Sequence, residues 1–151
     1  MTKPLIIDTN LLLLLIIGAV EDRRHIKNSS RLKDYNEDDY YAILEIFKRY
    51  DRILITPYIA TEISNLIDLR GDVKTSVMNF AREFFSKCEE IESSINIDCE
   101  DDFFLRFGIT DNSLIRLVRD YNVLTNDGRM VPFLYSVNPH NVIYYDLIRK
   151  R

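Results

Sequence analysis

The chain opens with a short apolar run that ends on an acidic residue. Leu5–Ile7 is uninterrupted and apolar, which is typical of a strand buried on both faces of a parallel sheet. Asp8 follows at once, and such a strand tolerates a carboxylate only at its end. The leucine-rich stretch Leu11–Ile17 then predicts a helix, with Thr9 or Asn10 as its N-cap. A strand, a terminal carboxylate and an immediate helix are typical of the first unit of a ligand-binding α/β sheet.

The length and net charge of the chain limit the kinds of protein it can be. Its 151 residues suit a single domain over residues 1–151 that can bury its own core. The net charge of −4 argues against a protein that binds nucleic acid through bulk positive charge. A local basic patch or a bound metal ion would still allow such binding. The acidic surplus is also what a carboxylate-rich metal site would produce.

The sequence shows no sign of a membrane span or of a zinc or disulfide framework. The apolar stretch Leu11–Val20 has ten residues, about half of the ~20 that cross a bilayer, and no positively charged leader precedes it. Cys88 and Cys99 match no zinc spacing, so we expect buried, reduced thiols. His25 and His140 have no companion ligands nearby in the sequence. We therefore expect a cytoplasmic protein without membrane contact.

Short apolar strands alternate with longer amphipathic helices along the rest of the chain. This alternation predicts an α/β fold with three α/β/α layers and a central, mostly parallel sheet of about four to five strands. Further strands are predicted at Ile53–Ile55, Val123–Thr125 and Val142–Tyr145, and helices after Asn36, from Pro57 to before Gly71, over Val73–Lys87 and over Asn112–Tyr121.

Four segments have a weaker pattern. Glu21–Asn36 is polar and mixed in charge, which predicts a mobile loop or a loosely helical insertion. Glu89–Ile97 predicts a short edge strand or an irregular stretch. The acidic cluster Asp98–Asp102 is interpreted as a helix start rather than a metal site, since first-turn acids are common. Pro132–Tyr135 predicts a short helix or an irregular segment.

Four acidic residues are expected to meet at one edge of the sheet. Asp8 ends the first strand, and Glu62 lies early in the helix after the second. Asp111 begins the helix that leads into the third strand, and Asp127 lies just past that strand's end. In a parallel sheet, the carboxyl ends of strands and the amino ends of most helices lie along the edge where ligands bind. The topology alone therefore predicts that the four carboxylates lie together.

Four neighbouring carboxylates repel each other unless a cation joins them. Oxygen ligands suit Mg²⁺ or Mn²⁺ rather than zinc, and such ions take further ligands from phosphates. The chemistry that fits is metal-assisted attack of water on a phosphodiester. Each acid alone is compatible with a helix cap or a turn, and it is the joint placement that predicts a site.

The ordered set of motifs around these acids resembles the PIN-domain family of ribonucleases, which includes the toxins of VapBC-type toxin–antitoxin pairs. The matching stretches are Ile6-Ile7-Asp8-Thr9-Asn10, Thr61-Glu62-Ile63, Ile109-Thr110-Asp111-Asn112-Ser113 and Leu124-Thr125-Asn126-Asp127. Together they span most of the domain. The sequence departs from the family pattern at Asn112, where alanine is usual, and at Gly128-Arg129-Met130, where an acid–phenylalanine pair is usual.

The resemblance implies an endoribonuclease that uses Mg²⁺ or Mn²⁺ to cut single-stranded RNA. Asp8, Glu62, Asp111 and Asp127 would be the catalytic, metal-binding acids, with Asn10 and Thr125 in supporting roles. It also implies a homodimer and, for a toxin, an antitoxin protein whose arginine or lysine reaches the carboxylates.

Two other functions remain open from the residues. A PIN-like module that binds RNA or protein without catalysis would have the same fold but would not require the four acids. A haloacid-dehalogenase-like phosphatase also places an aspartate at the end of its first strand. That class needs a second aspartate two residues later, where this chain has Asn10, and a neutral amide cannot serve as a general acid–base.

Overall fold

The structure is a computed structural model that describes residues 3–149. One five-stranded sheet runs through it, all of its strand pairs are parallel, and the strand order is β3-β2-β1-β4-β5. The predicted α/β class with a central parallel sheet is confirmed. The strands are β1 (Leu5–Ile7), β2 (Ile53–Ile55), β3 (Glu89–Glu90), β4 (Asn122–Thr125) and β5 (Val142–Tyr144).

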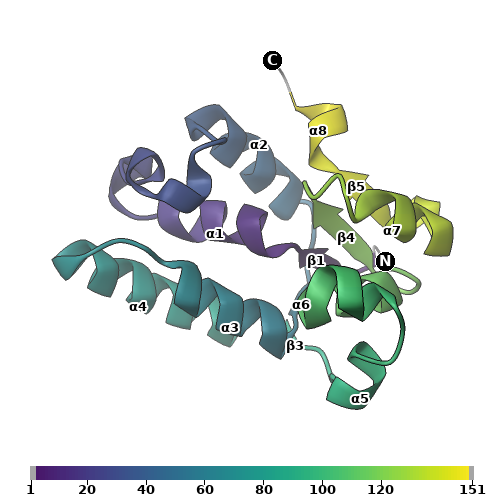
Figure 1. The fold of residues 1–151 in the computed structure, drawn as a ribbon. Coiled ribbons are helices and arrows are strands. Elements are labelled where there is room, and N and C mark those ends of the chain that lie inside the picture. Colours follow the sequence, from purple (N-terminus) through teal and green to yellow (C-terminus); the bar gives the residue numbers. More distant parts are fainter. Residues whose placement is uncertain (1–2, 150–151) are drawn as a thin grey trace.

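Helices cover both sides of this sheet. In Figure 1, α1 to α4 lie to the left of the strands, α7 lies to the right, and α6 lies below β1 and β4. No helix within residues 3–149 is both long and apolar enough to cross a membrane. The helices are α1 (Thr9–Gly18), α2 (Glu37–Phe47), α3 (Pro57–Leu66), α4 (Gly71–Lys87), α5 (Ile95–Asp98), α6 (Phe103–Leu117), α7 (Val131–Val137) and α8 (Tyr145–Ile148), and the 3₁₀ turns are η1 (Glu21–Arg23), η2 (Ile26–Asn28), η3 (Ser30–Leu32) and η4 (Pro139–Asn141).

The leucine-rich helix α1 lies at the centre of the core. Nine of its ten residues are buried, because α2, α3, α4 and the three turns η1 to η3 pack around it. A helix that is apolar on all sides is stable only in such a surrounded position. The ring of Tyr40 on α2 lies directly against Gly18, where a Cβ atom would overlap it. The first helix therefore serves as the core on which one whole layer packs.

The polar stretch from 21 to 36 is an ordered part of this layer. It forms the three 3₁₀ turns, which agrees with the predicted loosely helical insertion. Ile26 and Leu32 are buried and fix the turns against the core. Asn36 then caps α2 in a capping box with Asp39, as its position before an acidic first turn predicted.

Several predicted boundaries and environments are wrong. The N-cap of α1 is Asp8 itself, whose Oδ1 accepts the Thr9 N–H, so neither Thr9 nor Asn10 is the cap. Asp98 is not part of a helix start: it is the last residue of α5 and is almost completely buried, while α6 begins at Phe103. Tyr145 belongs to α8 and not to the last strand. The two cysteines are half-buried rather than buried.

The contact between Gly18 and Tyr40 gives a first prediction. Gly18→Ala should lower the free energy of unfolding by about 1–3 kcal/mol, because the added methyl group overpacks a filled core. Urea unfolding measures this change. In a Tyr40→Leu background, Gly18→Ala should lower the free energy of unfolding by less. Equal losses in both backgrounds would show that the contact with Tyr40 is not the cause.

Candidate functional site

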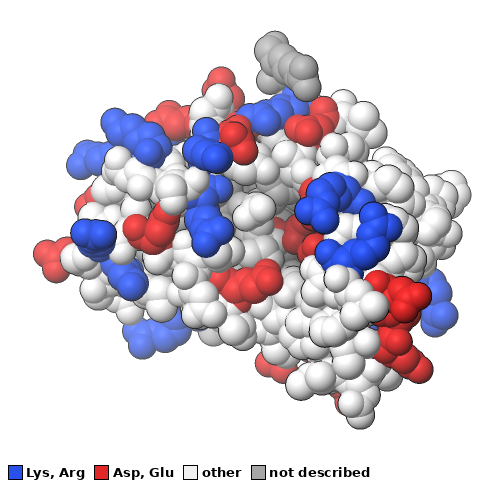
Figure 2. Space-filling view, in the orientation of Figure 1, with Lys and Arg blue, Asp and Glu red and all other residues white. Residues whose placement is uncertain are grey.

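A cleft of about 950 Å³ lies at the carboxyl ends of the central strands, and all four predicted acids line it. The strand order reverses between β1 and β4, and ligands of open α/β sheets bind at such a switch point. Asp8 follows β1 and Asp127 follows β4, so they lie on either side of this point. Figure 2 shows acidic side chains in a hollow on this face, with basic side chains on both sides of it.

Asp8 is held by hydrogen bonds on both oxygens. Its Oδ1 accepts the Thr9 N–H at 2.7 Å, and its Oδ2 accepts the Thr125 hydroxyl at 2.7 Å. The Thr125 oxygen in turn accepts the N–H of Asp127 at 3.0 Å. Thr125 therefore connects Asp8 to Asp127 at the switch point. Its hydroxyl links the end of β1 to the end of β4 by hydrogen bonds.

Glu62 is oriented by two threonines that the sequence did not reveal. Its Oε2 accepts the Thr9 hydroxyl at 2.9 Å, and its Oε1 accepts the Thr110 hydroxyl at 3.0 Å. These donors come from α1 and α6, while Glu62 lies on α3. Each threonine is the chain neighbour of a predicted acid, Asp8 or Asp111, and that adjacency is the only signal the sequence offers.

Asp111 reaches the cleft because α6 is interrupted at Gly108. Gly108 has φ 80° and ψ −179°, a conformation that is essentially restricted to glycine, and a new helical segment starts after it. The helix predicted from Asn112 is therefore the second segment of α6, which begins after Gly108. Within residues 3–149 the Asp111 carboxylate has no hydrogen bond. Asp127 differs from it, since its Oδ1 accepts the Arg129 N–H at 3.0 Å.

Asn10 is exposed at the start of α1 and lines the same cleft. Its side chain makes no hydrogen bond in the described part of the chain, so the structure gives it no positioning role among the acids. Its proposed support of a metal ion or its waters remains a prediction.

The surroundings of Asp8 and Asp111 disfavour their charged forms. Burial raises the pKa of Asp8 to about 6, although the bonds from Thr125 and Thr9 oppose this, and the charges of Asp127 and Glu62 add to it. Burial also raises the pKa of Asp111 to about 7, and the charges of Asp8, Asp127 and Glu62 contribute, while Arg129 lowers it. The charges of Asp127 and Glu62 therefore act on both Asp8 and Asp111.

The oxygen atoms of the four predicted ligands are of the kind that binds a hard divalent cation. The predicted ligands are carboxylates alone, which suit Mg²⁺ or Mn²⁺. As the side chains stand, no group of three or more acidic, histidine or cysteine residues within 3–149 is arranged to hold an ion.

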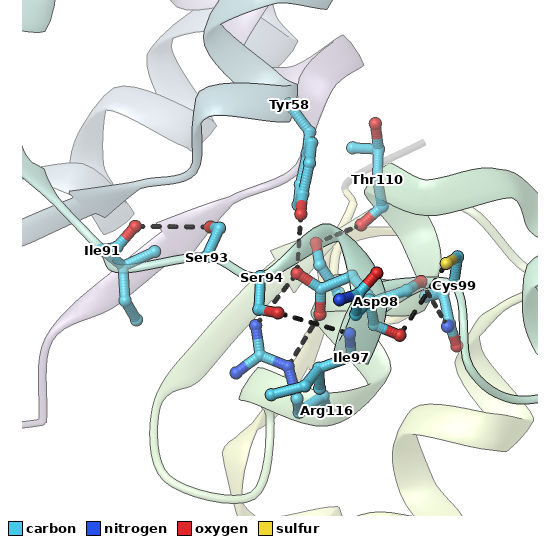
Figure 3. A network of polar contacts seen from close by, with 12 residues as sticks. Tyr58, Ile91, Ser93, Ser94, Ile97, Asp98, Cys99, Thr110 and Arg116 are labelled. Carbon is cyan, nitrogen blue, oxygen red and sulfur yellow. Dashed lines mark hydrogen bonds and ion pairs between the residues drawn. The ribbon is translucent and has the colours of Figure 1, made fainter.

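A polar network around the buried Asp98 carboxylate connects the two helices that carry Glu62 and Asp111. Asp98 accepts hydrogen bonds from Arg116 Nε at 2.7 Å and from the Tyr58 hydroxyl at 2.8 Å (Figure 3). Tyr58 lies on α3, one helical turn before Glu62, and Arg116 lies on α6. The side chain of Asp98 is 0% exposed, so these partners replace its lost hydration. Sequence reasoning missed this network because its members lie far apart in the chain.

Removing the cationic partner of Asp98 should destabilise the fold. Arg116→Met leaves the buried Asp98 carboxylate without its charge partner and should lower the free energy of unfolding by about 1–2 kcal/mol, because Arg116 is itself 38% exposed and water can replace part of the lost interaction. Arg119→Met is the matched control, because both partners of the Arg119–Asp120 pair are largely exposed, and a change below about 0.5 kcal/mol is expected there. Equal effects in urea unfolding would mean that the Asp98–Arg116 pair has no special role.

The raised pKa values of Asp8 and Asp111 give a prediction for the metal-free protein. Between about pH 4 and 7 the folded state binds more protons at these groups than the unfolded state, whose ordinary aspartate pKa is 3.8. Their contribution to stability is therefore lost as the pH rises through 6 and 7. In the presence of a chelator, Asp111→Asn should stabilise the fold more at pH 8 than at pH 5. A difference in urea midpoints that does not change with pH would refute this.

Comparisons with known proteins do not extend the description of the site. A scan against models of protein families found no match, and a search among curated proteins found no relative. What the protein does must be inferred from the residues of its cleft.

Proposed function

We propose that this protein is a metal-dependent endoribonuclease of the PIN type. The observation that carries the proposal is the convergence of four carboxylates, from four separate parts of the chain, on one cleft at the switch point of a parallel sheet. A single acid in such a cleft is compatible with a cap or a turn, but four of them repel one another. The four residues are Asp8, Glu62, Asp111 and Asp127.

These acids would hold Mg²⁺ or Mn²⁺. A bound ion of this kind makes hydroxide available from water near neutral pH and offsets negative charge that develops on a phosphate. The protein's part is to aim the ligands: Thr125 and the Thr9 N–H fix Asp8, and the hydroxyls of Thr9 and Thr110 fix Glu62. Fixed ligand orientation through such hydrogen bonds tunes a metal site.

Asp111 is the best candidate to orient the attacking water. Both oxygens of Asp8 and of Glu62 already accept a hydrogen bond from the protein. The carboxylate of Asp111 accepts none within residues 3–149, so both of its oxygens are available to a water or a substrate hydroxyl. It also lies in the first turn after the Gly108 break.

A role as a toxin is part of the same proposal. An antitoxin would have to block the carboxylates, most directly with an arginine or lysine side chain that binds them. A small open reading frame beside the gene would support this role. A homodimer is proposed on the family resemblance alone, and a cytoplasmic location on the cysteine pattern and the short apolar stretch of the sequence.

RNA cleavage tests the function directly. The wild-type protein should cut single-stranded RNA with Mg²⁺ or Mn²⁺ and should not cut it with a chelator. Asp8→Asn and Asp127→Asn should each lower the rate at least about 100-fold, because each removes a charged ligand from the site. Gel analysis of a labelled RNA measures the rate.

Asp146→Asn is the matched control, since Asp146 lines the same cleft but is not one of the four acids. It should retain most of the activity. The function is wrong if the wild type cuts nothing with either metal, or if the Asp8 and Asp127 variants cut as fast as the wild type. RNA binding without metal dependence or cleavage would instead favour the non-catalytic module.

A further inference from the structure

An acidic cleft needs nearby cations before it can receive an RNA strand. The net charge of the chain is −4, so its overall field does not attract a polyanion. Arg31 and Arg149 are the arginines that line the cleft itself. Arg149 is already engaged, because its guanidinium bonds both oxygens of Asp39, at 2.9 and 2.8 Å, and the Asp34 carbonyl at 2.6 Å.

A second group of arginines lies on the α6–α7 side of the cleft, stacked on phenylalanine rings. The guanidinium of Arg106 lies 5.2 Å from the ring centre of Phe107 and 5.1 Å from that of Phe133. Arg129 lies 5.8 Å from the ring centre of Phe107. Phe107 itself lines the cleft. In Figure 2 a group of basic side chains covers this side of the hollow.

The rings fix the arginines without using their hydrogen-bonding capacity. Phe107 and Phe133 pack edge to face, with centres 5.4 Å apart, and form a firm base for the guanidinium planes. Within residues 3–149, neither the Arg106 nor the Arg129 guanidinium makes a hydrogen bond or an ion pair. Both side chains are exposed, so their N–H groups point to solvent or to a ligand. Stacked arginines of this kind are suited to phosphate, which they bind through two parallel hydrogen bonds.

The position of Arg129 links this group to the carboxylates. Its backbone N–H bonds Asp127 Oδ1 at 3.0 Å, and its charge is among those that act on Asp111. A phosphate bound here would therefore lie beside the acids and not at a remote part of the surface.

We propose that Arg106 and Arg129, held on Phe107 and Phe133, bind the phosphates of the single-stranded RNA that enters the cleft. This inference rests on the proposed function, because it takes the substrate to be the strand cut at the four acids. It assigns the positioning of that strand to the α6–α7 side, through backbone phosphates and independently of base identity.

Binding of a labelled RNA oligonucleotide tests the inference apart from cleavage. Fluorescence anisotropy is measured with the full chain carrying Asp8→Asn, in Mg²⁺, over a series of salt concentrations. Arg106→Gln and Arg129→Gln in this background should each weaken binding by about tenfold. Each should also reduce the slope of log affinity against log salt by about 0.7, the value for one phosphate contact on a single strand.

Two further variants separate charge from structure. Arg82→Gln, on the exposed side of α4, is the matched control and should leave the affinity and the slope unchanged. Arg106→Lys keeps the charge but not the planar fork, so it should restore most of the salt slope and only part of the affinity. Urea unfolding of each variant shows whether the stack also supports the fold.

The outcomes distinguish the inference from the function. If the two arginine variants bind RNA as well as Arg82→Gln does, the inference is wrong, whether or not the wild type cuts RNA. If the wild type cuts no RNA but binding depends on both arginines, the proposed function fails and the inference stands. If the Asp8→Asn protein binds no RNA, the inference is overturned, and cleavage by the wild type decides the proposed function separately.

Discussion

The burial of one carboxylate at the end of β1 organises the centre of this structure. A buried Asp8 is acceptable only if its oxygens are hydrogen-bonded, and the donors come from the first residue of α1 and the last residue of β4. Satisfying it therefore fixes where α1 begins and brings β4 beside β1. Because Thr125 also accepts the N–H of Asp127, the same interaction sets the position of the next acid.

The rest of the fold keeps the neighbouring elements in place around this point. The buried helix α1 carries Thr9 at its first position and packs against α3, which carries Glu62. On the other side, the ion pair between the buried Asp98 carboxylate and the more exposed Arg116 connects α5 to α6, and the Tyr58 hydroxyl connects both to α3. Two sets of contacts thus hold the helices that carry these acids, α3 and α6. One set is apolar packing in the core, and the other is the polar network around Asp98.

The sequence predicted the strands that are apolar runs, and for the edge strand within Glu89–Ile97 it left a short strand and an irregular stretch as alternatives. Leu5–Ile7 is fully buried and Ile53–Ile55 is buried except at the partly exposed Ile53, so their apolar composition alone identifies them. Glu89–Glu90 is exposed and has no apolar pattern. It forms a strand through its pairing with β2, where the Ile91 N–H also bonds the Ile55 carbonyl. An edge strand of this kind depends on the sheet that is already present. Local patterns also could not show that Asp98 is buried.

The candidate site was predictable to the extent that topology determines it. The carboxyl ends of parallel strands share one edge, so acids that follow Ile7 and Thr125 must lie near each other. The threonines that orient Glu62 were not predictable, because a threonine beside an acid is common and its partner is set by packing. The break at Gly108 was indicated, since glycine before a polar turn of helix is a usual boundary.

The cleft combines two fixed carboxylates with two that have fewer partners. Asp8 and Glu62 each accept two hydrogen bonds from the protein, so their orientation is determined by the fold. Asp127 accepts one, and Asp111 accepts none within residues 3–149. Under the proposed function this difference has a physical meaning. The fixed pair would define the place of a cation, while the less constrained pair would adjust to the phosphate and to water. Binding of the cation would offset both the burial and the neighbouring charges that oppose the ionisation of Asp8 and Asp111.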